Sequence, residues 1–267
     1  MKPTVLISGA SGSMGAAATE SLAAEGWHVI MACRNTAKGS GVRDAILARH
    51  PEAEIELRQV DFTSLDSVRE FAESLGDRRI DVLFNNAGTI CRDWELTADG
   101  WEKTFQVNYL GPALLTQLLA GQTGKVVTMV SLTCGLTRLP LGYTGDKEKE
   151  FSQLGTYARA KLAMLLFTLE AGKRYEIPVA LADPGIVNSN MISMGRWFDP
   201  LADRLFRPFC SSPQKGVSPA LRAIRENGTE TRYFVRSRIL NVPQKYLEAA
   251  KDPALLNFIK TFDNRQK

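Results

Sequence analysis

The sequence predicts one α/β domain in which helices flank a doubly wound parallel sheet of about seven strands. Short apolar segments alternate with longer helical patterns along the chain, and a glycine-rich turn follows the first segment. The chain has 267 residues, 44% hydrophobic and 23% charged, which suits one large folded domain. No linker or internal boundary interrupts the alternation, so we expect residues 1–267 to form a single domain.

The composition argues against several other classes of protein. The net charge of +4 is carried by scattered lysines and arginines, without the basic, aromatic-rich patches of nucleic-acid partners. The cysteines are dispersed and only two histidines occur, which predicts free thiols and no metal site. The first apolar run breaks at Gly9, too early for a signal peptide or a membrane span. We therefore expect a cytoplasmic protein with neither a nucleic-acid partner nor a membrane span.

The order of elements follows from the apolar segments and the helical patterns between them. Crossovers between parallel strands are expected to be right-handed. Strands are predicted over 4–8, 28–33, 54–60, 81–84, 125–131, 179–182 and 233–235. Helices are predicted over 16–25, 36–49 and 101–120, from 64 and from 155 onward, and over 244–262.

The turn between the first strand and the first helix carries three glycines, Gly9, Gly12 and Gly15. Glycine permits a tight turn, close approach of a pyrophosphate, and close packing of the helix on the sheet. The amino end of the helix then offers free N–H groups and a partial positive charge to phosphates. A plain strand-to-helix turn is the alternative, but this context favours a dinucleotide-binding turn.

The second strand ends at Arg34 and Asn35, where this kind of fold meets the ribose of adenosine. An acidic residue there suits a free 2′-hydroxyl, whereas arginine suits a 2′-phosphate. Lys38 is near enough to share that phosphate. The pattern favours NADP(H) over NAD(H), with a merely solvated arginine as the alternative.

A pair of side chains on the helix from residue 155 is a candidate for proton transfer. Tyr157 and Lys161 are four residues apart, so they lie on one helix face. A nearby ammonium favours the phenolate, which would let the tyrosine act as a general acid near neutral pH. Such pairs also occur on ordinary solvated helices. The other unusual residues follow strands, at the edge where parallel sheets bind ligands: Gly9 to Gly15, Arg34, Asp61, Asn86 to Gly88, Ser131 to Thr133 and Pro184 to Gly185.

In this order the motifs resemble those of the short-chain dehydrogenase/reductase family over residues 3–190, and the resemblance implies a Rossmann-type fold. The segments Met31–Arg34 and Lys161–Phe167 are similar to the branch that includes retinol dehydrogenases and protochlorophyllide reductases. The resemblance implies that Tyr157 donates or accepts the substrate proton and that Lys161 lowers the Tyr157 pKa and holds the nicotinamide ribose. It implies that Asn108 anchors a water linked to Lys161.

The same resemblance implies a set of cofactor contacts along the carboxyl edge of the sheet. They would be Gly9, Ser11, Gly12, Ser13, Met14 and Gly15 at the pyrophosphate, and Arg34, Asn35 and Lys38 at the 2′-phosphate. Asp61, Phe62, Asn86, Ala87 and Gly88 would lie on the adenosine side, and Pro184, Gly185, Val187 and Ser189 by the nicotinamide.

Two positions depart from the family pattern. The middle glycine is expected one place later, where this chain has Ser13, so the geometry of the phosphate turn is open. Counting back from Gly135, the position of the family's catalytic serine holds Leu132, which cannot donate a hydrogen bond. We expect Thr133, or alternatively Ser131, to supply the hydroxyl; otherwise Tyr157 alone holds the substrate oxygen.

Three further segments bear on the substrate and on assembly. Residues 136–153 form a flap or an inert loop, and residues 190–210, rich in bulky apolar side chains, resemble the family's substrate lid. The terminal helix resembles one used for dimer contacts, which implies a homodimer or a homotetramer. We expect an NADP(H)-dependent oxidoreductase acting on a carbonyl or alcohol of a small apolar molecule. The alternatives are a reductase of a conjugated C=C bond and a non-catalytic NADP(H)-binding regulator.

Overall fold

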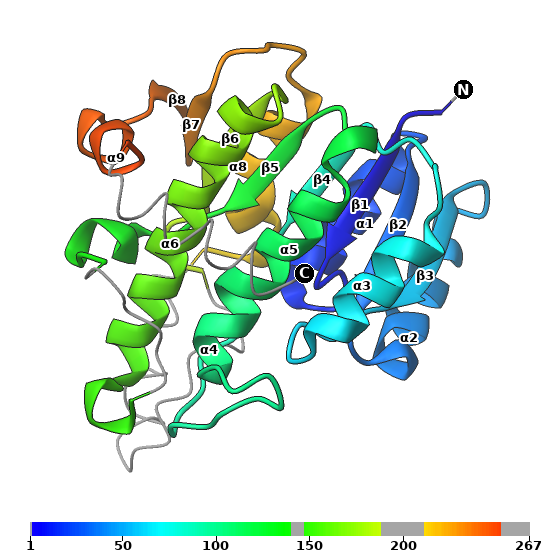
Figure 1. Cartoon of the computed structure of the whole chain (residues 1–267). Coiled ribbons are helices and arrows are strands. Elements are labelled where there is room, and N and C mark those ends of the chain that lie inside the picture. The colour runs from blue at the N-terminus through cyan, green and yellow to red at the C-terminus, as the bar shows by residue number, and fades with distance from the viewer. Residues whose placement is uncertain (1, 140–146, 188–210, 252–267) are drawn as a thin grey trace.

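An eight-stranded sheet forms the centre of the computed structural model, which describes residues 2–139, 147–187 and 211–251 (Figure 1). Its strand order is β3-β2-β1-β4-β5-β6-β7-β8, and the first seven of these are parallel. The chain reverses direction across the sheet between β1 and β4, which makes this the switch point where ligands bind in such sheets. The strands are β1 (Thr4–Ser8), β2 (His28–Cys33), β3 (Glu54–Gln59), β4 (Val82–Asn85), β5 (Val126–Met129), β6 (Val179–Asp183), β7 (Arg232–Val235) and β8 (Arg238–Asn241).

The predicted doubly wound sheet is confirmed, with one correction at its edge. The prediction ended the sheet at 233–235, but β8 follows and pairs antiparallel with β7. The hairpin turn places Arg236 at φ 50°, a left-handed conformation uncommon for a residue other than glycine. Every residue of β8 is exposed, so the strand lacks the alternating apolar pattern by which a strand is recognised.

Helices cover both faces of the sheet (Figure 1). The α3, α5 and α6 helices pack on one face in a large apolar core, and α1 and α8 pack on the other. The α8 helix was not predicted from the sequence; Ser212 caps its start, and Pro219 and Gly216 within it weaken the helical pattern. The helices are α1 (Ser13–Ala24), α2 (Thr36–Leu47), α3 (Leu65–Ser74), α5 (Gly111–Leu118), α6 (Gln153–Arg174), α8 (Pro213–Arg225) and α9 (Gln244–Ala249).

The helix predicted over 101–120 is wrong as a single element. A short α4 (Lys103–Phe105) leads into a π-helical turn over Gln106–Leu110, and α5 follows. The Glu102 carboxylate starts the segment by accepting hydrogen bonds from the backbone N–H groups of Thr104 and Phe105, at 2.9 and 2.7 Å. Pro112 cannot donate to a carbonyl four residues earlier, which breaks the α-helical ladder just where Asn108 lies.

Other predictions fall partly beyond the described residues. Of the helix predicted over 244–262, α9 accounts for the beginning, and residues from 252 lie outside the description. The proposed lid at 190–210 and residues 140–146 of the proposed flap also lie outside it. Among the helices that are described, none has the length and apolar character needed to cross a membrane.

Candidate active site

The glycine turn after β1 is locked to the end of β4. Gly9 has φ 66°, and a Cβ there would lie 2.8 Å from the Cα of Ala87, so both conformation and space require glycine. The Ser8 hydroxyl accepts hydrogen bonds from the backbone N–H groups of Asn86 and Ala87, each at 3.0 Å. The Asn86 amide donates to the Ser8 carbonyl at 2.9 Å. Predicted members of two different motifs are therefore in direct contact at the switch point.

The start of α1 suits a phosphate group. Gly12 is the N-cap residue, and no side chain in the described part of the chain caps this end, which leaves the first N–H groups of α1 to other acceptors. A Cβ on Gly15 would lie 2.3 Å from the Gly9 carbonyl oxygen, whereas one on Gly12 would lie 3.3 Å from the same atom. The atypical glycine spacing is therefore compatible with a tight turn, in which Gly9 and Gly15 are the strictly required glycines.

A cavity of about 490 Å³ lies along this edge of the sheet. It collects the predicted contacts with the pyrophosphate and with the adenosine side. Ala32, Val60, Thr89 and Val107 also line it and were not predicted, although the first two lie at the ends of predicted strands. Pro184, Gly185 and Val187 are not among its lining residues, and Ser189 lies outside the described part of the chain. The predicted residues that line it are Gly9, Ser11, Gly12, Ser13, Met14, Gly15, Arg34, Asn35, Lys38, Asp61, Phe62, Asn86, Ala87 and Gly88.

The far end of this cavity carries two cations. Arg34 and Lys38 both line it, and within residues 2–139, 147–187 and 211–251 neither forms a salt bridge. Asn35 caps α2, because its side-chain oxygen accepts a hydrogen bond from the Lys38 N–H at 2.8 Å. Asp61 on the facing loop accepts from the N–H and hydroxyl of Thr63, at 2.9 and 2.8 Å. The two cations are available to an anionic group, and Asn35 holds the turn between them.

The tyrosine and lysine of α6 lie at the end of β5. Lys161 is 4% exposed, and its Nζ donates to the Met129 carbonyl at 3.1 Å and lies 6.0 Å from the centroid of the Tyr157 ring. The Ser131 side chain is hydrogen-bonded to the Tyr157 phenol. Behind it, the Thr133 hydroxyl donates to the Ser131 oxygen at 3.0 Å. Thr133, Ser131 and Tyr157 thus form a chain of hydroxyl groups beside a buried lysine.

The count from Gly135 put Leu132 at the position of the family's catalytic serine, with Thr133 or Ser131 as the source of the hydroxyl. Ser131, one residue earlier, is the residue in contact with the phenol, and Leu132 is 48% exposed. Thr133, the hydroxyl preferred from the sequence, reaches Tyr157 only through Ser131, and which of the two orients a substrate oxygen stays a prediction. Residues Leu132–Leu136 form a 3₁₀ turn, so distance from Gly135 along the chain does not fix which side chain faces α6.

Burial dominates the ionisation of this pair. Desolvation raises the pKa of Tyr157, and the hydrogen bond from Ser131 offsets only part of that rise. Burial lowers the pKa of Lys161 to about 8. Burial therefore outweighs the lowering of the Tyr157 pKa that was expected from Lys161. A phenol that keeps its proton is suited to donate it to a substrate oxygen.

Asn108 links the π-helical turn to the loop after β4. Its amide nitrogen donates to the carbonyls of Thr89 and Thr104, both at 2.7 Å, and its oxygen accepts from the Thr89 N–H at 3.3 Å. A Cβ on Gly88 would lie 2.8 Å from this oxygen and 3.5 Å from Lys161 Nζ. The side chain is thus a structural link in the π-helical turn, and its predicted water-anchoring role stays a prediction.

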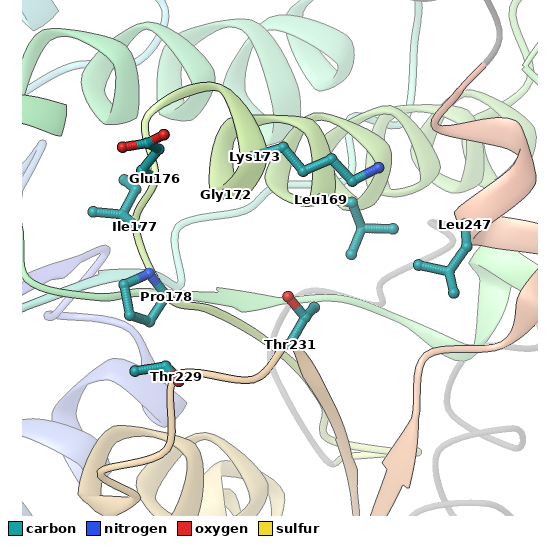
Figure 2. A pocket seen from close by; sticks show the side chains of 9 residues that line it. All are labelled: Leu169, Gly172, Lys173, Glu176, Ile177, Pro178, Thr229, Thr231 and Leu247. Carbon is teal, nitrogen blue, oxygen red and sulfur yellow. The ribbon is translucent and has the colours of Figure 1, made fainter.

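A second cavity, of about 340 Å³, lies at the other edge of the sheet (Figure 2). Ile177 and Pro178 precede β6, and Thr229 and Thr231 precede β7, so the cavity opens at the amino ends of these strands. Parallel sheets of this kind bind their ligands at the carboxyl ends. The first cavity, which contains the glycine turn, is therefore the candidate cofactor site.

The sequence is similar to several characterised proteins. Residues 3–196 match the model of a family described as short chain dehydrogenase. Retinol dehydrogenase 12 from Homo sapiens is 30% identical over 236 residues, which cover 85% of this chain and 74% of that protein. The WW domain-containing oxidoreductase from Danio rerio is 33% identical over 273 residues, 94% of this chain and 65% of that protein.

Solved structures agree in fold. An uncharacterised protein from Mycobacterium paratuberculosis superimposes with a TM-score of 0.76 at 29% identity, covering 97% of this chain and 92% of that one. Levodione reductase superimposes with a TM-score of 0.69 at 20% identity, covering 87% and 95%. With the glycine turn, the Tyr157 and Lys161 pair and the family match in agreement, the chain belongs to the short-chain dehydrogenase/reductase family of oxidoreductases, whose members use a nicotinamide dinucleotide.

Proposed function

We propose that the protein is an NADP(H)-dependent oxidoreductase that interconverts a carbonyl and an alcohol on a small apolar molecule. The observation that carries the proposal is the chain of hydroxyls from Thr133 through Ser131 to Tyr157, beside buried Lys161. It lies at the same edge of the sheet as the cavity built on the glycine turn. The relative named retinol dehydrogenase 12 supports an alcohol or aldehyde as the reacting group.

The roles of the residues follow from these contacts. The bound cofactor supplies or accepts the hydride at the substrate carbon. Tyr157 gives its proton to the substrate oxygen during reduction and takes it back during oxidation. Ser131, held in place by the Thr133 hydroxyl and by its own contact with Tyr157, orients that oxygen. Lys161, anchored on the Met129 carbonyl, keeps a positive charge beside the phenol and would hold the ribose of a bound cofactor.

Exposed apolar side chains around this position favour an apolar substrate. Leu132 and Leu136 follow Ser131, Leu154 precedes Tyr157 and Ile186 follows the turn after β6. All four are large and exposed, and each lies close in sequence to a residue of the proposed reaction centre or to the turn after β6. Burying such side chains against a ligand would contribute to binding through the hydrophobic effect.

A binding titration and a substrate panel test the proposal together. We expect tight binding of NADPH, weaker binding of NADH, and turnover of apolar aldehydes or ketones measured by NADPH absorbance. Turnover restricted to conjugated enones would favour the C=C reductase. Binding of NADPH with no turnover on aldehydes, ketones or enones would favour a non-catalytic regulator.

Preference for NADPH is expected to depend on the two cations of the cavity. Replacing Arg34 or Lys38 by alanine should raise the Kd of NADPH about 10- to 100-fold, the value of a hydrogen bond to a charged group, and leave the Kd of NADH nearly unchanged. Arg43→Ala is the control, because Arg43 is on α2 with Lys38 but pairs with Asp44 at 2.9 Å. Equal losses for NADPH and NADH would contradict the assignment of a 2′-phosphate site.

The two hydroxyls beside Tyr157 are expected to differ in importance. Ser131→Ala removes the contact with the phenol and should lower kcat about 10²–10³-fold, as for loss of one positioned donor. Thr133→Val removes only the group behind Ser131 and should lower kcat much less. Steady-state kinetics on both variants decides the matter, and a larger loss for Thr133→Val would restore Thr133 as the orienting residue.

A further inference from the structure

Asp183 is a buried carboxylate beside the proposed reaction centre, and the sequence pattern did not single it out as a site. It ends β6 and is 0% exposed. The adjacent strand β5 runs beside it, with the Val130 N–H donating to the Ala182 carbonyl at 2.9 Å. Met129, whose carbonyl anchors Lys161, pairs with Ala182 in the sheet. The carboxylate therefore lies one strand away from the residues that precede Ser131.

The side chain of Asp183 lies on the α6 face of the sheet. Successive residues of a strand point to opposite faces. Val179 and Leu181 belong to the core under α5 and α6, whereas Ala180 and Ala182 belong to the core under α1 and α8. By this alternation, Asp183 shares a face with Lys161 and Tyr157 of α6.

Two hydrogen bonds hold the carboxylate in place. One oxygen accepts from the Gly185 N–H at 2.9 Å, which fixes the turn where Gly185 has φ 70°. The other oxygen accepts from the Tyr233 hydroxyl at 3.1 Å. An asparagine could hold the same turn and contact the same hydroxyl, so these two bonds do not require a negative charge.

The negative charge of Asp183 has no direct counter-ion among the described residues. Within the described part of the chain no lysine, arginine or histidine forms a salt bridge to it. Arg236, at the β7–β8 turn, acts on it from a greater distance, and its other titratable neighbours are Tyr233, Tyr157, Tyr246 and Cys134. Burial raises the pKa of Asp183, while Gly185, Tyr233 and Arg236 oppose that rise. A buried charge that is only partly compensated is costly, and a positively charged ligand would offset that cost.

The nicotinamide ring is positively charged in the oxidised cofactor and neutral in the reduced one. Asp183 follows Ala182, which pairs with Met129, the residue that anchors Lys161, so its charge acts at the reaction centre, where it helps to raise the pKa of Tyr157. We propose that the Asp183 carboxylate is a fixed negative charge that favours the oxidised over the reduced nicotinamide, an inference that rests on the proposed function. Charges in such a weakly screened interior interact over longer distances than in water.

The test is the ratio of two dissociation constants, Kd for NADP⁺ divided by Kd for NADPH, measured by fluorescence titration. Asp183→Asn keeps both hydrogen-bonding positions and removes the charge, so the ratio should rise about three- to tenfold. Tyr233→Phe removes one hydrogen bond and keeps the charge, so any change should be equal for the two cofactor forms. A substitution that only loosens the turn changes both dissociation constants by the same factor, so their ratio stays the same.

A second charge variant keeps the proposal testable if Asp183→Asn does not fold. Arg236 is an exposed residue whose charge opposes that of Asp183, so Arg236→Gln should lower the ratio. An unchanged ratio in Asp183→Asn, or in Arg236→Gln if that variant alone folds, would overturn the proposal. So would an equal rise for Tyr233→Phe. Failure of the unaltered protein to bind either cofactor form would instead overturn the proposed function, and the role of Asp183 with it.

Discussion

A Tyr157→Phe protein is expected to bind NADPH with unchanged affinity and to turn over substrate about 10²–10⁴-fold more slowly, the usual contribution of a positioned general acid. Phenylalanine keeps the ring and its packing on α6, but it removes the proton that the buried phenol retains. Lys161 keeps its bond to the Met129 carbonyl, so the charge beside the site stays in place. Cofactor titration and single-turnover kinetics on the same preparation measure the two effects separately.

The control is Tyr175→Phe, at the other end of α6. Tyr175 packs beside Arg174 at the C-terminal end of the helix, away from Ser131. It should leave both cofactor binding and turnover unchanged. Near-normal turnover by Tyr157→Phe would rule out its assignment as proton donor, whatever the cofactor affinity.

The second large effect is expected at the glycine turn. In Gly15→Ala the new methyl group would lie 2.3 Å from the Gly9 carbonyl oxygen and 2.7 Å from the Cα of Ala10, both backbone atoms that cannot simply rotate away. Overpacking of this kind costs about 1–3 kcal/mol, which corresponds to a fall in Tm of roughly 2–12 °C for a protein of this size. Because the turn would carry the pyrophosphate, the Kd of NADPH should also rise by about tenfold or more.

Gly41→Ala provides the matched control, since it adds the same methyl group where no atom of the described residues lies within 4 Å. Gly41 is an exposed position inside α2, so alanine should stabilise the protein by about 0.5–1 kcal/mol. Thermal denaturation should therefore show a lower Tm for Gly15→Ala and a slightly higher one for Gly41→Ala. Cofactor titration should show a higher Kd of NADPH for Gly15→Ala and an unchanged Kd for Gly41→Ala. A Gly15→Ala protein with normal Tm and normal Kd would show that the turn adapts without loss.

The elements that were predicted well are those with strong local patterns. The strands β1, β2, β4, β5 and β6 are apolar runs buried on both faces, and they were recognised from composition alone. The edge strand β8 was missed because its exposed residues carry no such pattern. The π-helical turn was missed because Pro112 and Glu102 act on the backbone ladder and not on the apolar periodicity.

In the candidate site, too, the features with a local pattern were predicted and the contacts between separate elements were not. Spacing within one element placed Tyr157 and Lys161 on one face of α6, and the glycine turn followed from its position between strand and helix. Contacts between elements could not be obtained from spacing, which is why Leu132 was assigned to the position that Ser131 occupies. The direction of the Tyr157 pKa shift also depends on burial, which is a property of the folded chain.

The sequence by itself therefore determined the alternation of strands and helices, the phosphate turn and the paired tyrosine and lysine. Each of these depends on residues close together along the chain, whose backbone preferences and periodicity are local. Only the tertiary structure decided that Ser131 faces Tyr157, that Asn108 links the π-helical turn to the loop after β4, and that Asp183 is buried against Tyr233. Those contacts join residues from separate strands and helices, and the packing of the sheet between its two helical layers brings them together.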